Sequence, residues 1–518
     1  MKKDEELYKQ AQVSIENYHA FLGCLKTNEH SAFIEFVKAP IHEVQEDVVD
    51  LATYLEHGVN NTQIHLLEDP SLIRRFSSVR GTQKISAHLT GLNQKLKTLL
   101  ILIERFIVYI QMIEDKPIYH RVLVKGLKER NSNGLFLKAA ADFRTSLNKT
   151  QLTLMAAEDR YWLENRCYYH QSTDHTTDFE VFKRNIEAFE LFNQVATLRN
   201  YLEILNRNIE DAQRAEQYDL TFNAIVEQVE KQSTYPVLIK LYIFIINILK
   251  TGNELPSPFY ADFKVSFHEA KDKLASIDQL ILVKACINHL AHVYYQLDAP
   301  WLKEMFEWMK YLSQNTLYNV EETISDGEYL NFYVVAQALG EMDVLADFEK
   351  KYRKYLGKEV KAQVLDLCKS YSLQREEKID AALKLLEETF PSHSKKHLKY
   401  DIRAKELRVM LCYENVLLQK KWEEKPLADL ERNIENLKHY CQRLVKREVL
   451  TEQTSAPHHN FQRVASKFHS LQTKIDEKKK KSLIKKIEQT LAQGEPISNR
   501  SWIKKQLALL GKKSERES

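Results

Sequence analysis

Apolar side chains recur at helical spacing along almost the whole chain. Between residues 5 and 26, Leu7, Ala11, Ile15 and Tyr18 lie three or four positions apart, as on one face of a helix. Almost no segment shows the strict alternation of apolar and polar residues that indicates a strand. The pattern predicts helices that include residues 31–38, 82–114, 277–297, 300–315, 328–340, 344–356, 360–373, 377–390, 400–420 and 427–446.

The clearest internal repeat lies in residues 328–390. Apolar stripes mark the successive helices of two pairs, which start near residues 328 and 361, a spacing of about the 34 residues of a tetratricopeptide unit. The full W-x2-L-G-x2-Y pattern of that repeat is absent. The stripes consist of Tyr329, Phe332, Ala336 and Leu339; Leu345, Phe348, Tyr352 and Leu356; Val364, Leu367 and Tyr371; and Ile379, Ala382, Leu383 and Leu386. The spacing favours an α-solenoid of antiparallel, degenerate tetratricopeptide-like helix pairs.

Breaks in the pattern divide the chain. Residues 1–170 form an N-terminal helical region, and residues 178–450 form the solenoid, whose pairs are clearest at 328–446. The polar stretch 451–460 resembles a linker, residues 461–511 form a helical C-terminal cap, and residues 512–518 form a disordered tail.

Composition supports an all-α chain. The 518 residues include only 12 Gly and 11 Pro, too few for the many tight turns of β-rich or α/β folds. Hydrophobic residues make up 44%, enough to bury large cores. No apolar run reaches the 18 or more residues of a membrane span, and the polar start MKKDEELYKQAQ does not resemble a signal peptide. We therefore expect a cytoplasmic protein without membrane contact.

Charge and cysteine content add few constraints. The formal net charge is +3, which gives no global field to attract nucleic acid. The six cysteines are scattered, which indicates neither a disulfide framework nor a zinc finger. Between residues 70 and 103, however, six basic residues occur with no acidic one, and this density can neutralise phosphates. They are Arg74, Arg75, Arg80, Lys84, Lys95 and Lys97.

Candidate chemistry is sparse. His289 and His292 lie three positions apart on one helix face, a spacing that can bind a metal, but no adjacent carboxylate completes a motif. Packing in the core is the simpler interpretation, so no metal site is predicted. His458 and His459 lie in the expected linker, where a solvated pair is the simpler interpretation. The chain has no G-x-S-x-G, GxGxxG or P-loop motif, so it predicts no nucleotide cofactor.

The order of features resembles a family of uncharacterised bacterial all-helical, tetratricopeptide-like proteins of about 500 residues. The resemblance rests on FIEFVKAP at residues 33–40, LRNYLEILNRN at 198–208 and RSWIKKQL at 500–507. It implies an architecture and no chemistry.

Stacked helix pairs usually hold a protein or peptide on their concave face. The sequence therefore favours a non-catalytic interaction scaffold without a cofactor. Val334, Gln337 and Lys369 are offset from the core stripes and are expected to face the partner-binding groove, with Gln337 and Lys369 as its contact residues. Two alternatives remain open. One is a nucleic-acid-associated protein using residues 70–103, and the other is an enzyme whose site is not visible in the sequence.

Overall fold

The computed structural model of the chain is entirely helical. It describes residues 2–517 except 27, 43–44, 61–65, 78–83, 174–177, 207–211, 232–234, 252–257, 297–299, 320–323, 358–360, 392–399, 419–423, 448, 451 and 474–475. These residues form 23 α-helices and four short 3-10 helices, and none of those described lies in a strand. The expected all-α class is confirmed. No helix in the described part of the chain is long and apolar enough to cross a membrane.

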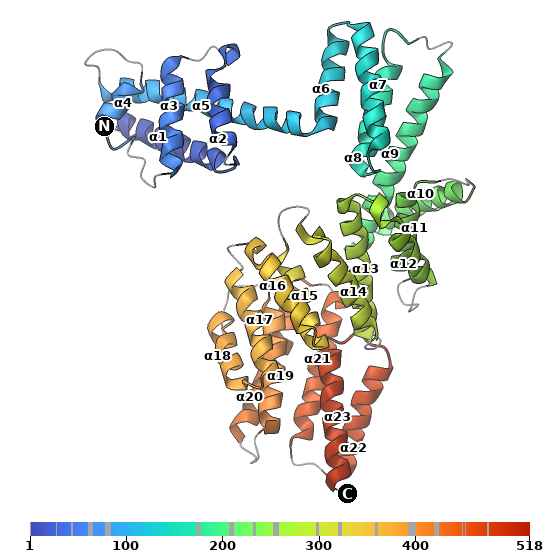
Figure 1. Ribbon diagram of the computed structural model, residues 1–518. Coiled ribbons are helices and arrows are strands. Elements are labelled where there is room, and N and C mark those ends of the chain that lie inside the picture. Colours follow the sequence, from blue (N-terminus) through green and yellow to red (C-terminus); the bar gives the residue numbers. More distant parts are fainter. Residues whose placement is uncertain are drawn as a thin grey trace. The chain divides into compact units, whose positions relative to one another are not determined.

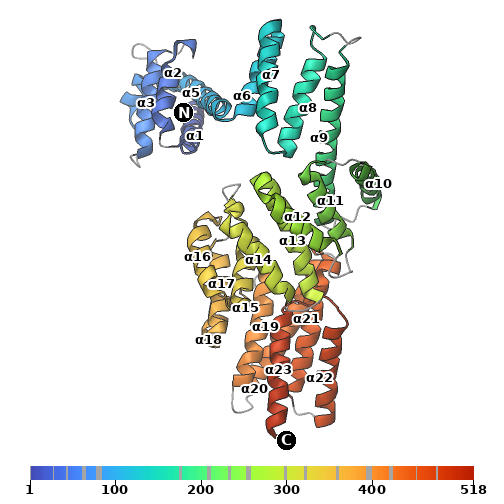
Figure 2. The same ribbon diagram turned by 45° about the vertical axis from the view of Figure 1, so that its right-hand side comes forward.

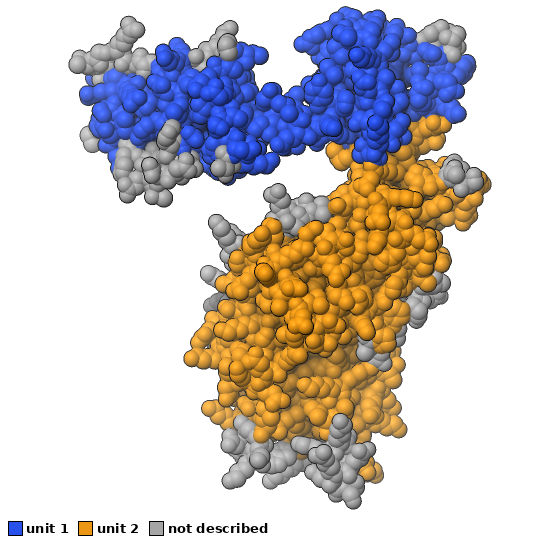
Figure 3. Space-filling model, in the orientation of Figure 1, with its two compact units in different colours: residues 1–150, 158–186 blue, residues 151–157, 187–518 orange. Residues whose placement is uncertain are grey.

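The chain divides into two compact units (Figure 3). Unit 1 comprises residues 1–150 and 158–186, and unit 2 comprises residues 151–157 and 187–518. The first seven helices belong to unit 1, while α8 and α9 each contribute residues to both units. The bounds of these nine helices are α1 Lys2–Leu22, α2 Glu29–Lys38, α3 Glu46–Asn60, α4 Pro70–Arg75, α5 Ile85–Glu114, α6 Lys116–Glu129, α7 Asn133–Lys149, α8 Leu154–Tyr168 and α9 Phe179–Asn206.

Helix α5 organises the first part of unit 1. It packs against α1, α2, α3 and α4, and its stripe Leu89, Leu92, Leu96 and Leu99 is fully buried. This is the apolar face that the spacing within residues 82–114 predicts. Lys95, on the same helix, is also buried and forms an ion pair with Asp47 of α3.

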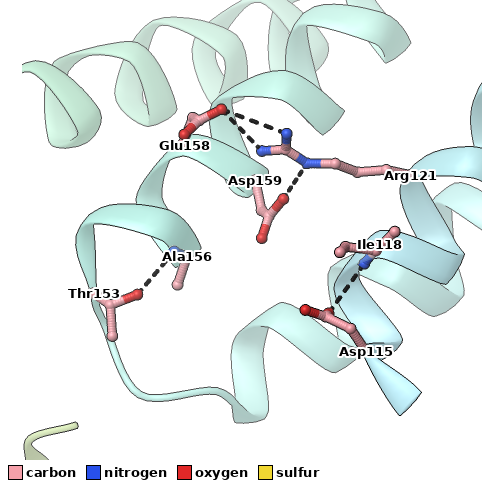
Figure 4. A network of polar contacts seen from close by, with 7 residues as sticks. All are labelled: Asp115, Ile118, Arg121, Thr153, Ala156, Glu158 and Asp159. Carbon is pink, nitrogen blue, oxygen red and sulfur yellow. Dashed lines mark hydrogen bonds and ion pairs between the residues drawn. The ribbon is translucent and has the colours of Figure 1, made fainter. Parts of the chain in front are cut away.

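A polar network joins α6 to α8 within unit 1. Figure 4 shows the guanidinium of Arg121 between the carboxylates of Glu158 and Asp159, with both of which it forms ion pairs. Arg121 also lies over the Trp162 ring at 5.6 Å from its centroid. Burial raises the pKa of Asp159, and the neighbouring Arg121 partly opposes that rise. Asp115 caps α6 by accepting a 3.2 Å hydrogen bond from the backbone N–H of Ile118.

Unit 2 contains fourteen further helices around one large core. Neighbours in sequence pack together as α11 with α12, α13 with α14, α15 with α16, α17 with α18 and α19 with α20. The bounds are α10 Ala212–Lys231, α11 Val237–Lys250, α12 Pro258–Ala270, α13 Ser276–Gln296, α14 Pro300–Gln314, α15 Asp326–Leu339, α16 Met342–Tyr352, α17 Lys361–Arg375, α18 Ile379–Thr389, α19 Asp401–Leu418, α20 Glu424–Lys446, α21 Glu452–Leu471, α22 Glu477–Ala492 and α23 Arg500–Glu517.

The α15–α16 pair illustrates how sequence produces this packing. Ser325 and Glu328 form a capping box at the start of α15, and Gly340, with φ +80°, ends it in a left-handed conformation that favours glycine. Between these signals the stripe buries Phe332 against Phe348 of α16, with ring centroids 3.8 Å apart and nearly parallel planes. The apolar stripes expected for both helices therefore form their interface.

The three C-terminal helices α21, α22 and α23 run side by side in two views (Figure 1, Figure 2). Two expectations for this region were wrong. Residues 452–460 are not a linker but the beginning of α21, which contains Pro457. The helix tolerates this proline because only one backbone hydrogen bond is lost, while Phe461, Val464 and Phe468 bury its apolar face. Helix α23 continues to Glu517, so residues 512–517 are helical rather than a disordered tail.

Candidate functional site

A cavity of about 300 Å³ lies among the helices of unit 2. This volume is at the lower end of the range of about 300–1,000 Å³ that is typical of small-molecule sites. Its wall is drawn from α13, α14, α15, α17, α19 and α21 and from the start of α23. The lining residues are Ile287, Asn288, Ala291, Tyr294, Leu302, Met305, Met309, Asn331, Val334, Val335, Ala338, Tyr371, Ile402, Arg403, Glu406, His458, Ser498, Asn499 and Ser501.

Helical spacing explains why these residues reach one space. On α15 the cavity is lined by Asn331, Val334, Val335 and Ala338, which are three or four positions apart or adjacent. Residues at this spacing share one face of a helix. The apolar half of the wall comes mainly from such faces of α13, α14 and α15, and the polar half comes from α19, α21 and the start of α23.

A buried carboxylate lies at the centre of the polar half. Glu406 of α19 is only 5% exposed and accepts three hydrogen bonds. Its Oε1 accepts from His458 Nδ1 at 2.7 Å and from the Ser498 hydroxyl, and its Oε2 accepts from Asn499 Nδ2 at 3.1 Å. Because an ionised carboxylate only accepts, Nδ1 of His458 carries a proton. Glu406 thus ties α19 to α21 and to the start of α23.

Asn499 has an unusual backbone at this point. Its φ is +53°, in the left-handed region that few residues other than glycine and asparagine adopt. The carbonyl of Asn499 accepts a hydrogen bond from the N–H of Ile503 at 3.1 Å, in the first turn of α23. The N–H of the preceding Ser498 donates to the Pro457 carbonyl of α21 at 3.1 Å. The bend therefore sets both the start of α23 and the direction of the Asn499 amide.

A second contact fixes α23 against α19. The indole N–H of Trp502 donates to Glu414 Oε1 at 2.7 Å, and Gln374 Nε2 of α17 donates to the same oxygen at 3.1 Å. Burial raises the pKa of Glu414, and the hydrogen bonds from Trp502 and Gln374 oppose this rise. The ring of Trp502 also packs edge-on against Tyr413 and Phe468. These contacts hold α23, which begins at the polar wall of the cavity, against α19 and α17.

Arg403 is the cation of the cavity wall. It lies three residues before Glu406 on α19, so both side chains are on one face of that helix. Its Nη2 donates to Oδ1 of Asn331 on α15 at 2.6 Å. Among the described residues, no carboxylate forms an ion pair with Arg403.

The residues that the sequence analysis places in a partner-binding groove differ in where they lie relative to the cavity. Gln337 is partly buried and donates through Nε2 to the Ser372 hydroxyl of α17 at 3.2 Å, and it does not line the cavity. Lys369 is exposed on α17. Val334, whose offset from the core stripe also places it toward a groove, does line the cavity.

The other sequence candidates are dispersed. His289 is buried, the side chain of His292 lies outside the described part, and no group of three or more potential metal ligands occurs among the residues described. Of the basic residues in 70–103, Arg74, Arg75, Lys84 and Lys97 are exposed, Lys95 is paired with Asp47, and Arg80 lies outside the described residues. All six cysteines are free thiols, and only Cys24 is exposed.

The expectation of a solvated pair at His458 and His459 was wrong, because both side chains are partly buried on α21 and His458 bonds to Glu406. Periodicity did not reveal the polar wall, since its residues come from three separated segments. Comparison with known proteins returned no match to a family model, to a curated protein or to a solved structure.

Proposed function

We propose that the protein is a non-catalytic binding protein, in which unit 2 is a short α-solenoid that holds a partner in its cavity. The packing supports this. Besides the contacts within pairs, the first helices of successive pairs contact one another, α11 with α13, α15 with α17, α17 with α19 and α19 with α21. Contacts between first helices are expected in a tetratricopeptide stack, where these helices form the inner surface, so they support the proposal.

The single observation that carries the proposal is the location of the cavity. Four of the helices that line it, α13, α15, α17 and α19, are the first members of the pairs described above, and α14 is a second member. A cavity lined mainly by first helices supports the proposal, because the first helices of tetratricopeptide stacks line the side that holds a partner. It also combines apolar walls with a few converging polar groups, the combination typical of binding sites. The partner is a small molecule, or a protein or peptide with a side chain or terminus small enough to enter the cavity.

Binding is favoured over the enzyme alternative by the hydrogen bonds of Ser498. A serine nucleophile needs a base that accepts its hydroxyl proton, usually a histidine. Here the Ser498 hydroxyl donates a hydrogen bond to Glu406. His458 Nδ1 donates a hydrogen bond to the same carboxylate. Ser498 and His458 both donate to Glu406, so the serine hydroxyl is not hydrogen-bonded to the histidine as a nucleophile would be. No catalytic role is therefore assigned to them.

The nucleic-acid alternative has less support. Lys95, one of the six basic residues of the stretch, is 7% exposed and forms an ion pair with Asp47. Arg75 lies over the ring of Phe76 at 5.1 Å. The cytoplasmic location and the resemblance to all-helical bacterial proteins remain parts of the proposal and rest on the sequence alone.

The experiment compares the protein with a variant whose cavity is filled. Ala291→Phe places a ring from α13 into the cavity, and Ala381→Phe makes the same change on the exposed surface of α18. Melting of the full chain is followed against a library of small molecules and short peptides. Ligands that raise the melting temperature of the wild type and of Ala381→Phe, but not of Ala291→Phe, support the proposal. If every compound that stabilises the wild type also stabilises Ala291→Phe, the proposal is contradicted.

A further inference from the structure

The polar half of the cavity contains a carboxylate whose acceptor sites are mostly occupied. Glu406 already accepts from His458, Ser498 and Asn499, two of these on Oε1 and one on Oε2. Hydrogen bonds to an ionised acceptor are among the strong ones, so the protein itself solvates this carboxylate. Glu406 therefore offers a ligand few further acceptor sites.

Arg403 is in the opposite situation. A guanidinium has five N–H donors, and the only partner that the described residues give Arg403 is the neutral amide oxygen of Asn331, at 2.6 Å. Its charge thus faces the cavity without a counter-ion among those residues. An anionic group on a ligand supplies both the charge and the acceptors that are missing.

A second guanidinium lies next to the same wall. Arg500 stands between the lining residues Asn499 and Ser501 and is 5% exposed. Its Nη2 donates to the Leu491 carbonyl, whereas Nε and Nη1 have no hydrogen-bond partner among the described residues. Its electrostatic neighbour is Tyr294, which lines the cavity. An unpaired buried cation is costly, and it raises the local potential for an anion.

The remainder of the wall selects the body of the ligand. Leu302, Met305 and Met309 of α14 and Val334 and Val335 of α15 present only apolar atoms to the cavity. Methionine side chains adapt to irregular shapes, which suits a site that accepts an apolar chain or ring. The cavity is thus apolar at one end, and at the other it has the guanidinium of Arg403, which forms no ion pair with a carboxylate of the described residues.

We propose that the cavity binds a carboxylate carried on an apolar body, with the carboxylate accepting hydrogen bonds from Arg403 and the body packed against α14 and α15. This inference rests on the proposed function and specifies its ligand. Two sources carry this chemistry. One is a free organic acid of fatty-acid type, and the other is the C-terminus of a peptide that ends in an apolar residue.

The test uses pairs of probes that differ only in the anionic group. Decanoate is compared with decan-1-ol, and N-acetyl-Leu-Phe is compared with its C-terminal amide, by isothermal titration calorimetry on the full chain. Since a hydrogen bond to a charged group is worth about 1.5–3 kcal/mol, at least one acid is expected to bind about 10- to 100-fold more tightly than its neutral counterpart. The tighter of the two acids identifies the source.

Arg403→Gln keeps a donor for Asn331 and removes the charge. We expect it to weaken binding of the preferred acid by about 10- to 100-fold and to leave binding of the neutral probe unchanged. Lys350→Gln on α16 is the matched control, because it removes one positive charge from an exposed position away from the cavity wall. Melting of each variant in the absence of probe shows whether the fold is intact.

The two proposals fail in different ways. If the neutral probes bind as tightly as the acids, and Ala291→Phe abolishes both, the cavity is a binding site and the inference about the carboxylate is overturned. If Arg403→Gln and Lys350→Gln weaken binding of the acid equally, the anchoring role of Arg403 is also overturned. If no probe binds, or if Ala291→Phe binds all of them like the wild type, both the inference and the proposed function are contradicted.

Discussion

Replacing Glu406 by glutamine tests whether this carboxylate holds the cavity wall together. The substitution keeps the size of the side chain but turns one acceptor oxygen into an N–H donor. Glu406 receives three donors, two on Oε1 and one on Oε2, so either orientation of the amide sets a donor against a donor. The remaining bonds also lose the assistance of the charge.

The magnitude follows from these contacts. One lost hydrogen bond to a charged group costs about 1.5–3 kcal/mol, and weakening of the others adds about 1 kcal/mol. His458 is partly exposed and can bond to water instead, which reduces the total. We expect a local loss of about 2–3 kcal/mol, which corresponds to a roughly 30- to 150-fold increase in the opening equilibrium.

Amide hydrogen exchange resolves this effect because it reports on local opening rather than on global unfolding. The diagnostic amides are those of Ser498, which donates to Pro457, and of Ile503, which donates to Asn499. Both should lose protection by the factor given above, while amides of unit 1 keep theirs. The control is Glu435→Gln on α20, which removes exposed contacts with Lys438 and His439 that are worth about 0–1 kcal/mol each. Unchanged protection at Ser498 and Ile503 in Glu406→Gln would refute the reasoning.

Three further expectations concern stability and reactivity. Arg121→Ala leaves the buried carboxylate of Asp159 without its cation and should destabilise unit 1 by about 2–3 kcal/mol, seen as earlier loss of exchange protection in α6 and α8; an unaltered pattern contradicts this. Burial raises the pKa of Asp278 in the folded chain above its usual value of 3.8, so between 3.8 and the raised pKa the folded chain binds more protons than the unfolded chain. The free energy of unfolding therefore falls as the pH rises from 3.8 to the pKa of the folded state. Asp278→Asn should remove that part of the pH dependence while its Oδ1 still accepts from Tyr242, and melting curves that keep the wild-type slope oppose the assignment. Alkylation at pH 8 should modify Cys24 and spare the five buried thiols, among which burial raises the pKa of Cys412 to about 11; rapid appearance of more than one adduct by intact mass argues against the described burial.

Most of the helices could be predicted from the sequence because burial is periodic. Tyr329, Phe332 and Phe348 recur at helical spacing, and all three lie in the core. The same logic, applied to a position beside the stripe, placed Val334 toward a groove, and Val334 lines the cavity. Periodicity finds apolar faces and the residues adjacent to them.

The polar wall could not be predicted in this way. Glu406, His458 and Asn499 come from segments separated by tens of residues, and nothing in their local sequence indicates that they meet. Pro457 misled the prediction further, since proline usually marks the end of a helix, yet here it lies within α21. The groove assignment of Gln337 did not anticipate Ser372, because pairing between side chains of different helices depends on tertiary packing.

The most direct test is a crystal structure of the full chain soaked with whichever of the two acids, decanoate or N-acetyl-Leu-Phe, binds more tightly. We expect difference density that fills the cavity among α13, α14, α15 and α19, with the carboxylate within hydrogen-bonding distance of the Arg403 guanidinium and the apolar part of the acid against Met305 and Met309. A cavity that stays empty at a saturating concentration of that acid, with the acid bound only on the outer surface, would contradict the claim that this space is the binding site.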